Sequence, residues 1–332
     1  MKSLSSASSN IRYWFTTGCP PLDVILTGKV GTGLPAGRVC ELFGKENVGK
    51  TTLGVEIIRH VQKAGGLGCI IDTEATFTAV RGLGLGLNED ALVYIEEQYV
   101  EPIIDAISET IDAVGMVPTV IFWDTIAGTP SVQEIGHKIG EGPLGIHARA
   151  LSQGFRRIAR PLANSNVLLL ACNQLKVGAM AKPFATERET DATLGGSAIK
   201  FHAEIRLKLD YGRKVFKEIG KRKQEVGFEG RATAVKNKGF VQGGKARLIF
   251  LYSDGGRFNS ALSCLRTLQD WNVVGKGKSI QFNGEKLSED KWSTNYIVNR
   301  GGMRTVVHKL LEDTFVERFG IAKQNEEDEE EE

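Results

Sequence analysis

Residues 44–51 read Gly44-Lys45-Glu46-Asn47-Val48-Gly49-Lys50-Thr51, and this stretch decides the fold. It fills every fixed position of the GxxxxGK[ST] pattern, in which glycines let backbone amides point at phosphate oxygens. An apolar stretch at 38–43 predicts a buried strand before it, and helical spacing of apolar residues at 52–61 predicts a helix after it. We expect this loop and Thr52 to bind nucleotide phosphates, with Lys50 on the β- and γ-phosphates and the Thr51 hydroxyl on Mg²⁺.

Two further apolar stretches end in carboxylates. The stretch 69–74 ends in Asp72-Thr73-Glu74, and the stretch 119–124 ends in Asp124. In open parallel sheets, chemistry gathers at the carboxyl ends of the strands. Glu74 is therefore a candidate general base for the water that attacks the γ-phosphate, and Asp124 a candidate for holding Mg²⁺ through water. The alternative for Glu74 is a helix-capping or solvent-facing carboxylate.

Composition is that of an ordinary globular protein. The chain has 332 residues, of which 41% are hydrophobic and 25% charged, enough for one large α/β domain and a smaller unit. No apolar run is long enough to cross a membrane, and the first residues lack a signal-peptide core. The five scattered cysteines have no metal-binding spacing. We therefore expect reduced core thiols in a cytoplasmic protein without a membrane partner.

Charge is unevenly distributed along the chain. The formal net charge is +2, but the last seven residues, 326–332, are all acidic, so the rest of the chain carries +9. A basic body with an acidic tail indicates a polyanionic partner with which the tail competes. A merely solvated, disordered tail explains the same residues equally well.

The order of patterns predicts a mostly parallel α/β sheet with flanking helices. We expect a short, partly disordered segment at 1–15, a core at 16–258, a small basic lobe at 259–325 and the acidic tail at 326–332. Two stretches without periodicity, 131–144 and 176–196, are long enough to be ligand-binding loops, although ordinary solvated loops fit them too. The remaining expectations are helices at 101–114 and 146–162, strands at 91–95, 166–174 and 201–209, a basic turn at 214–223, paired antiparallel strands at 231–238 and 246–252, and short helices and turns beyond 257.

The order of these motifs resembles the RecA family of homologous-recombination ATPases, and is most similar to the bacterial RecA type or a phage relative. The phosphate loop alone is shared by many NTPases. A Gly-Gly-x-Ala-x-Lys-Phe stretch at 195–201, followed by Lys236-Asn237-Lys238, is far more specific. Together the matching stretches run through residues 16–258, and they include 17–23, 71–74, 122–125, 145–153, 173–174, 194–201 and 235–238.

The resemblance implies roles for individual residues. Glu74 matches the catalytic glutamate, Asp124 the metal-associated aspartate and Gln174 the γ-phosphate sensor. Lys236 and Lys238 match lysines that reach the ATP of the neighbouring subunit. Phe201 matches an aromatic that packs across the filament interface, and Arg81 occupies the position of an adenine-stacking tyrosine. The stretches 131–147 and 175–196 match the two DNA-binding loops, which implies DNA contacts by Arg149, Arg156, Lys176, Lys182 and Arg188.

These implied roles predict a DNA-dependent ATPase. It would use ATP and Mg²⁺, form a homo-oligomeric helical filament on single-stranded DNA, and catalyse pairing and strand exchange with double-stranded DNA in recombination and repair. The segment before residue 16 is much shorter than the family's polymerisation helix and linker, which puts the usual docking of subunits in question. Two alternatives stay open: an accessory paralogue that binds ATP and DNA without strand exchange, and a ring-forming helicase.

Overall fold

The computed structural model describes residues 11–136, 145–175, 193, 197–254, 257–277 and 279–321. Its centre is an eight-stranded sheet in the order β10-β9-β8-β3-β7-β6-β4-β5. The pairings from β8 through β3 to β5 are all parallel, whereas β9 and β10 are added antiparallel. The strands are β3 (Arg38–Gly44), β4 (Leu67–Asp72), β5 (Leu92–Ile95), β6 (Thr119–Asp124), β7 (Val167–Gln174), β8 (Ile205–Ile219), β9 (Arg222–Asn237) and β10 (Lys245–Leu251).

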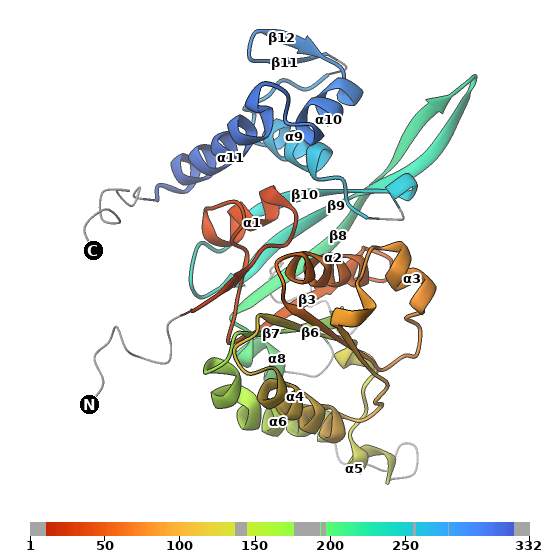
Figure 1. Ribbon diagram of the computed structural model, residues 1–332, viewed down its shortest axis with the longest axis vertical. Coiled ribbons are helices and arrows are strands. Elements are labelled where there is room, and N and C mark those ends of the chain that lie inside the picture. Colours follow the sequence, from red (N-terminus) through yellow and green to blue (C-terminus); the bar gives the residue numbers. More distant parts are fainter. Residues whose placement is uncertain are drawn as a thin grey trace, which may run out of the picture.

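Helices cover both faces of this sheet (Figure 1). On one face lies α2 (Lys50–Lys63), and on the other lie α4 (Val100–Val114) and α6 (Ile146–Ala163). The approach of α2 is close because Gly54 faces the sheet: a Cβ atom there would come within 2.6 Å of the Phe122 ring. The predicted α/β class with a mostly parallel sheet and flanking helices is thus confirmed. Shorter elements are β1 (Trp14–Phe15), α1 (Pro20–Thr27), β2 (Leu34–Pro35), α3 (Ala79–Gly84), α5 (Val132–Ile135) and α8 (Ser197–His202).

The C-terminal segment (residues 257–321) packs beside α1 and β10. It contains α9 (Ser260–Asp270), a small hairpin of β11 (Ile280–Phe282) and β12 (Glu285–Leu287), α10 (Glu289–Ile297) and α11 (Met303–Phe319). Its buried residues, among them Trp292 and Phe315, belong to the same apolar cluster as α1 and one face of the sheet. With a helix of 17 residues, this segment is more regular than the expected short helices and turns.

Three local predictions were wrong. The stretch after Ser131 is not all loop, because Ser131 and Glu134 form a capping box that begins α5. Phe201 lies in α8 rather than in a strand, because Ile199 and Ala203 are buried one helical turn apart. The stretch 214–223 is not a turn region: it is the end of a long β8–β9 hairpin, closed by the two-residue loop Gly220-Lys221. The predicted antiparallel pairing of 231–238 with 246–252 is confirmed in β9 and β10.

The structure also bears on two predictions made from composition, that the cysteines are reduced core residues and that no segment crosses a membrane. All five thiols are free and buried, as expected of core residues. Burial raises the pKa of Cys69 and of Cys264 to about 12. Within the described residues, no helix has the length and apolarity needed to cross a bilayer.

A buried polar set lies inside the sheet. Glu41 of β3, 1% exposed, accepts a hydrogen bond from Asn173 Nδ2 of β7 at 2.8 Å and another from Arg206 Nε of β8. The Arg206 guanidinium also stacks over the Phe43 ring, 4.6 Å from its centroid. Glu41 therefore joins three adjacent strands and neutralises a buried cation.

We predict that Glu41→Ala costs about 3–5 kcal/mol of stability, because it leaves the Arg206 charge buried without its partner. Urea unfolding followed by tryptophan fluorescence measures this loss. The matched control is Glu285→Ala, which removes an exposed carboxylate and should change stability by less than about 0.5 kcal/mol. An equally small effect of Glu41→Ala would contradict the proposed role of the carboxylate.

Candidate nucleotide-binding site

The backbone conformation of the phosphate loop requires glycine at particular positions. It joins β3 to α2, with positive φ at Asn47 (57°) and Gly49 (92°). A Cβ atom on Gly44 would lie 2.3 Å from the Leu209 carbonyl oxygen, and one on Gly49 would lie 2.5 Å from the Phe250 ring. The loop therefore needs glycine at both positions, and Val48, 2% exposed, fixes it to the core.

Lys50 lies across the mouth of this loop. Its Nζ donates to the carbonyl oxygens of Gly44 at 3.2 Å and Lys45 at 2.6 Å. It is also the first residue of α2, a helix whose N-cap, Gly49, provides no side-chain acceptor. The first amide groups of a helix have no partner within the helix, so here they remain available to an anion. The ammonium group and the helix terminus thus favour negative charge at the same place.

Thr51 meets Asp124 across two elements. The Thr51 hydroxyl on α2 donates to Asp124 Oδ2 at the end of β6, at 2.7 Å. A hydroxyl beside a carboxylate is an oxygen pair of the kind that Mg²⁺ prefers, and Mg²⁺ usually keeps water and substrate phosphates as its other ligands. The residues present therefore fit a magnesium-bound nucleotide, with Thr51 and Asp124 on the metal side and Lys50 on the phosphate side.

Glu74 lies at the same edge of the sheet, two residues after β4. Its side chain is exposed, yet partial burial raises its pKa, and so do the negative charges of Asp124 and Asp72, while Lys50 opposes them. Asp72 anchors the segment by accepting hydrogen bonds from the amides of Glu74 and Phe77 and from the Tyr94 hydroxyl. A carboxylate in this position, beside the metal-binding pair, is a candidate proton acceptor.

Gln174 is the last residue of β7 and lies opposite Gly44 in the parallel register. The next amide, that of Leu175, donates to the Gly44 carbonyl oxygen at 3.3 Å. Gln174 therefore lies beside the entrance of the phosphate loop and directly precedes the stretch 176–196. The structure thus brings together Lys50, Thr51, Glu74, Asp124 and Gln174, as the sequence predicted.

Lys236 and Lys238 lie elsewhere in this subunit. Lys236 pairs in register with Arg206, which lies opposite Glu41 in the middle of β3, whereas the phosphate loop follows the carboxyl end of β3. Its Nζ donates to the carbonyl oxygens of Lys200 at 2.5 Å and Phe201 at 3.4 Å. Partial burial, Lys238 and Arg206 lower the pKa of Lys236. Lys238 Nζ lies 3.7 Å from Glu204 Oε2. In the part of the chain that the structure describes, neither lysine forms a hydrogen bond or ion pair with the phosphate loop.

The remaining predicted site residues are dispersed. Arg81 lies on α3 with an exposed side chain, and Phe201 on α8 is 76% exposed. Arg149 and Arg156 are exposed on α6, seven residues apart and so on one side of the helix. Lys176, Lys182 and Arg188 fall outside the described residues.

A hydroxyl network behind the metal pair was missed by the sequence reasoning. Thr73 Oγ1 accepts from the Thr125 amide at 3.0 Å and also lies within hydrogen-bond distance of the Asp124 and Thr125 carbonyl oxygens. Thr125 Oγ1 donates to the Cys172 carbonyl oxygen at 3.0 Å. These bonds join the ends of β4, β6 and β7 behind Asp124. The available signal was a repeated Asp-Thr pair, at 72–73 and at 124–125.

This site and the sheet that carries it define a P-loop NTPase with a RecA-like core. The sequence model of the RecA N-terminal domain matches residues 3–256 of the chain, more than two thirds of its length. The chain therefore belongs to the RecA family, and the resemblance seen in its motifs is confirmed. Proteins of this family are ATPases that generally use Mg²⁺, bind DNA and form filaments.

We predict that Thr51→Ala lowers the affinity for magnesium-bound nucleotide by about 10- to 100-fold, the range seen when one metal-ordering group is lost. Titration with a fluorescent ATP analogue, with and without Mg²⁺, measures the effect. Thr110→Ala is the control, since the Thr110 hydroxyl donates to the Ala106 carbonyl oxygen of α4 and is not part of the phosphate loop or the Thr51–Asp124 pair, so the change should leave binding unchanged. Equal losses with and without Mg²⁺ would argue against a metal role for Thr51.

We predict that Glu74→Gln slows hydrolysis by about 100-fold or more, as expected for loss of a general base, while nucleotide binding is retained. Glu74 must be deprotonated to accept a proton, so its raised pKa should place the acidic limit of kcat/KM above the pKa of an ordinary glutamate. Asp72→Asn removes one of the charges that raise this pKa and should move the limit to lower pH. Glu109→Gln, an exposed change on α4, is the control; an acidic limit that persists in Glu74→Gln would assign it to another group.

Proposed function

We propose that the protein is an ATP-dependent recombinase that polymerises on single-stranded DNA and catalyses homologous pairing and strand exchange. The observation that carries this proposal is the separation of the expected ATP-site residues into two groups within one chain. Lys50, Thr51, Glu74, Asp124 and Gln174 gather at the carboxyl ends of the parallel strands, while Lys236 and Lys238 lie at the end of β9, where Lys236 pairs with Arg206 and bonds to α8. A site divided in this way is completed by a second copy of the chain.

Within one subunit, each residue has a defined task. Bound ATP with Mg²⁺ supplies the phosphoryl group and the charge that activates it. Lys50 and the α2 N-terminus hold the phosphates, and Thr51 and Asp124 orient the metal side of the site. Glu74 accepts a proton from the attacking water at its carboxylate. The Thr73–Thr125 network keeps Asp124 in place during these steps.

Lys236 and Lys238 complete the site from the neighbouring subunit. Their positive charges would stabilise the charge that develops on the transferring phosphoryl group, as an arginine finger does. The exposed Phe201 on α8 offers an apolar contact to that neighbour.

Gln174 links the nucleotide to DNA. It lies beside Gly44 and directly precedes the stretch 176–196, so a contact between its amide and the terminal phosphate would position that stretch. Lys176, Lys182 and Arg188 would then bind the phosphate backbone, together with Arg149 and Arg156 on α6. Backbone-directed cations suit binding of single strands without sequence preference.

The experiment that tests the proposal is ATP hydrolysis with and without single-stranded DNA, combined with negative-stain imaging of the same samples and a strand-exchange assay. Stimulated hydrolysis, helical filaments and exchanged product are the expected results. Closed rings would indicate a helicase. Binding of ATP and DNA without stimulation or filaments would indicate an accessory paralogue, and either result would overturn the proposal.

Mixed subunits test the divided site directly. We predict that Lys50→Ala and Lys236→Ala proteins are each inactive alone, whereas an equal mixture recovers about a quarter of the activity, because one junction in four then joins an intact phosphate loop to an intact lysine. DNA-stimulated phosphate release measures the recovery. The control is a mixture of Lys50→Ala with Glu74→Gln. Both changes lie on the phosphate-loop side of the site, so every junction in this mixture contains one defective residue and no activity should be recovered. No recovery in the first mixture would place Lys236 in the site of its own chain.

A further inference from the structure

The Glu74 carboxylate depends on its backbone for its position. Among the described residues, no donor forms a hydrogen bond with this carboxylate, and the side chain is exposed. It lies against Gly128, where a Cβ atom would come within 3.3 Å of Glu74 Oε1. Its place beside the metal-binding pair is therefore set by the turn that carries it, residues 72–77, which we call the Glu74 turn.

Packing does little to hold the Glu74 turn. Residues 74–76 are exposed, and Phe77 is half-buried beside a cavity of 280 Å³ between α3 and β5. Ala75 has a φ of 52°, a left-handed conformation that a residue other than glycine keeps only where the surrounding structure holds it. The conformation of the turn therefore depends on its hydrogen bonds.

Asp72 accepts the hydrogen bonds that close the turn. Its Oδ1 accepts from the Glu74 amide at 3.1 Å, and its Oδ2 accepts from the Phe77 amide at 2.7 Å, so one carboxylate spans the turn. The Tyr94 hydroxyl of β5 donates to the same Oδ2 at 3.0 Å. The orientation of Asp72, and with it the position of Glu74, is thus linked to a side chain on the neighbouring strand.

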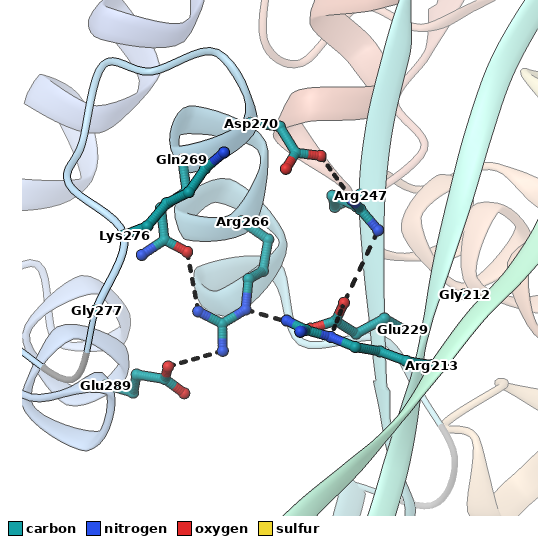
Figure 2. Close-up of a pocket in the computed structure, with 10 residues that line it drawn as sticks. All are labelled: Gly212, Arg213, Glu229, Arg247, Arg266, Gln269, Asp270, Lys276, Gly277 and Glu289. Atoms are coloured by element: carbon teal, nitrogen blue, oxygen red, sulfur yellow. Dashed lines mark hydrogen bonds and ion pairs between the residues drawn. The ribbon is translucent and has the colours of Figure 1, made fainter.

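Asp72 is held differently from another buried carboxylate of the protein, that of Glu229. Glu229 is 3% exposed and lies among three guanidinium groups (Figure 2): Arg213 donates to it at 2.8 and 3.0 Å, and Arg266 and Arg247 lie 3.4 and 3.8 Å away. Asp72 is 4% exposed, yet within the described residues it pairs with no cation and has three neutral donors. A buried carboxylate needs its hydrogen bonds satisfied, so the loss of one of three donors should release the others.

The Tyr94 hydroxyl suits the task of a constant donor. Partial burial and the hydrogen bond to Asp72 raise the pKa of Tyr94 to about 12, so the hydroxyl keeps its proton at neutral pH. The tyrosine ring is 40% exposed, and its centroid lies 6.4 Å from that of Phe77. The ring therefore adds little buried area, and the hydroxyl makes the specific contact.

We propose that Tyr94 is a positioning residue for ATP hydrolysis. Through Asp72 it keeps the Glu74 turn closed, and the closed turn keeps the Glu74 carboxylate beside the Thr51–Asp124 pair. The hydroxyl touches neither the nucleotide nor the attacking water, so its effect passes entirely through Glu74. This inference rests on the proposed function, in which Glu74 accepts the proton of that water.

The test is Tyr94→Phe in the full chain, which removes the hydroxyl and keeps the ring beside Phe77. We expect kcat for ATP hydrolysis to fall about tenfold with KM for ATP unchanged, a smaller loss than in Glu74→Gln because the carboxylate is displaced rather than removed. Adding Tyr94→Phe to Glu74→Gln should lower kcat no further, because the two residues act as one unit. Tyr13→Phe is the matched control, since within the described residues the Tyr13 hydroxyl has no hydrogen bond and the ring packs on Phe15.

Hydrogen exchange tests the same link without hydrolysis. The Glu74 and Phe77 amides are protected by Asp72, so peptides that cover residues 72–77 should exchange severalfold faster in Tyr94→Phe and at the normal rate in Tyr13→Phe. Mass spectrometry of the peptides measures both rates on the samples used for kinetics.

Three results would overturn the proposal: a kcat equal to that of Tyr13→Phe, unchanged exchange of the turn, or a further loss of kcat when Tyr94→Phe is added to Glu74→Gln. Full hydrolysis by Glu74→Gln would remove Glu74 from proton transfer and overturn the role of Tyr94 with it. Absent hydrolysis in the unsubstituted protein would remove the proposed function, and the exchange rates would still decide whether Tyr94 keeps the turn closed.

Discussion

Parallel pairing of β3 with β7, of β7 with β6 and of β6 with β4 is the constraint on which the site depends. Each of these strands ends at the same edge of the sheet, so four short sequence segments far apart in the chain meet there. The Thr51–Asp124 hydrogen bond exists because α2 begins where β3 ends and β6 ends two strands away. A slip of one residue in any of these pairings would turn the terminal carboxylates toward the wrong face of the sheet.

The buried Glu41 helps to hold the strands in this register in the interior of the sheet. A carboxylate among parallel strands is costly unless its hydrogen bonds are satisfied, and here Asn173 and Arg206 satisfy them from both sides. Asn173 directly precedes Gln174, and Arg206 lies opposite Lys236 in the β8–β9 pairing. One polar cluster therefore borders both the residue expected to sense the nucleotide and the lysine expected to serve the next subunit.

The sequence predicted those parts of the molecule that depend on residues close together in the chain. The phosphate loop, the two carboxylate-ending strands and Gln174 were found because motif and flanking pattern lie within a few residues of each other. The alternation at 201–209 was misread, because Ile199, Phe201 and Ala203 suit either a strand or one turn of a helix. The hairpin at 214–223 was missed because its charged arms show no apolar alternation. The ion pairs of Glu41 and Glu229 join residues far apart in the chain, so no local pattern reveals them.

The five buried thiols give the protein a set of internal stability probes. Cys40, Cys69 and Cys172 lie on three different strands of the sheet, Cys264 on α9 and Cys19 beside α1. Only the thiolate reacts with alkylating reagents, and burial keeps each group protonated and out of reach. The rate at which each cysteine is labelled under native conditions therefore reports how often its own element opens. Mass spectrometry of the labelled peptides would rank the strands that carry the nucleotide site by their local opening, without any engineered reporter.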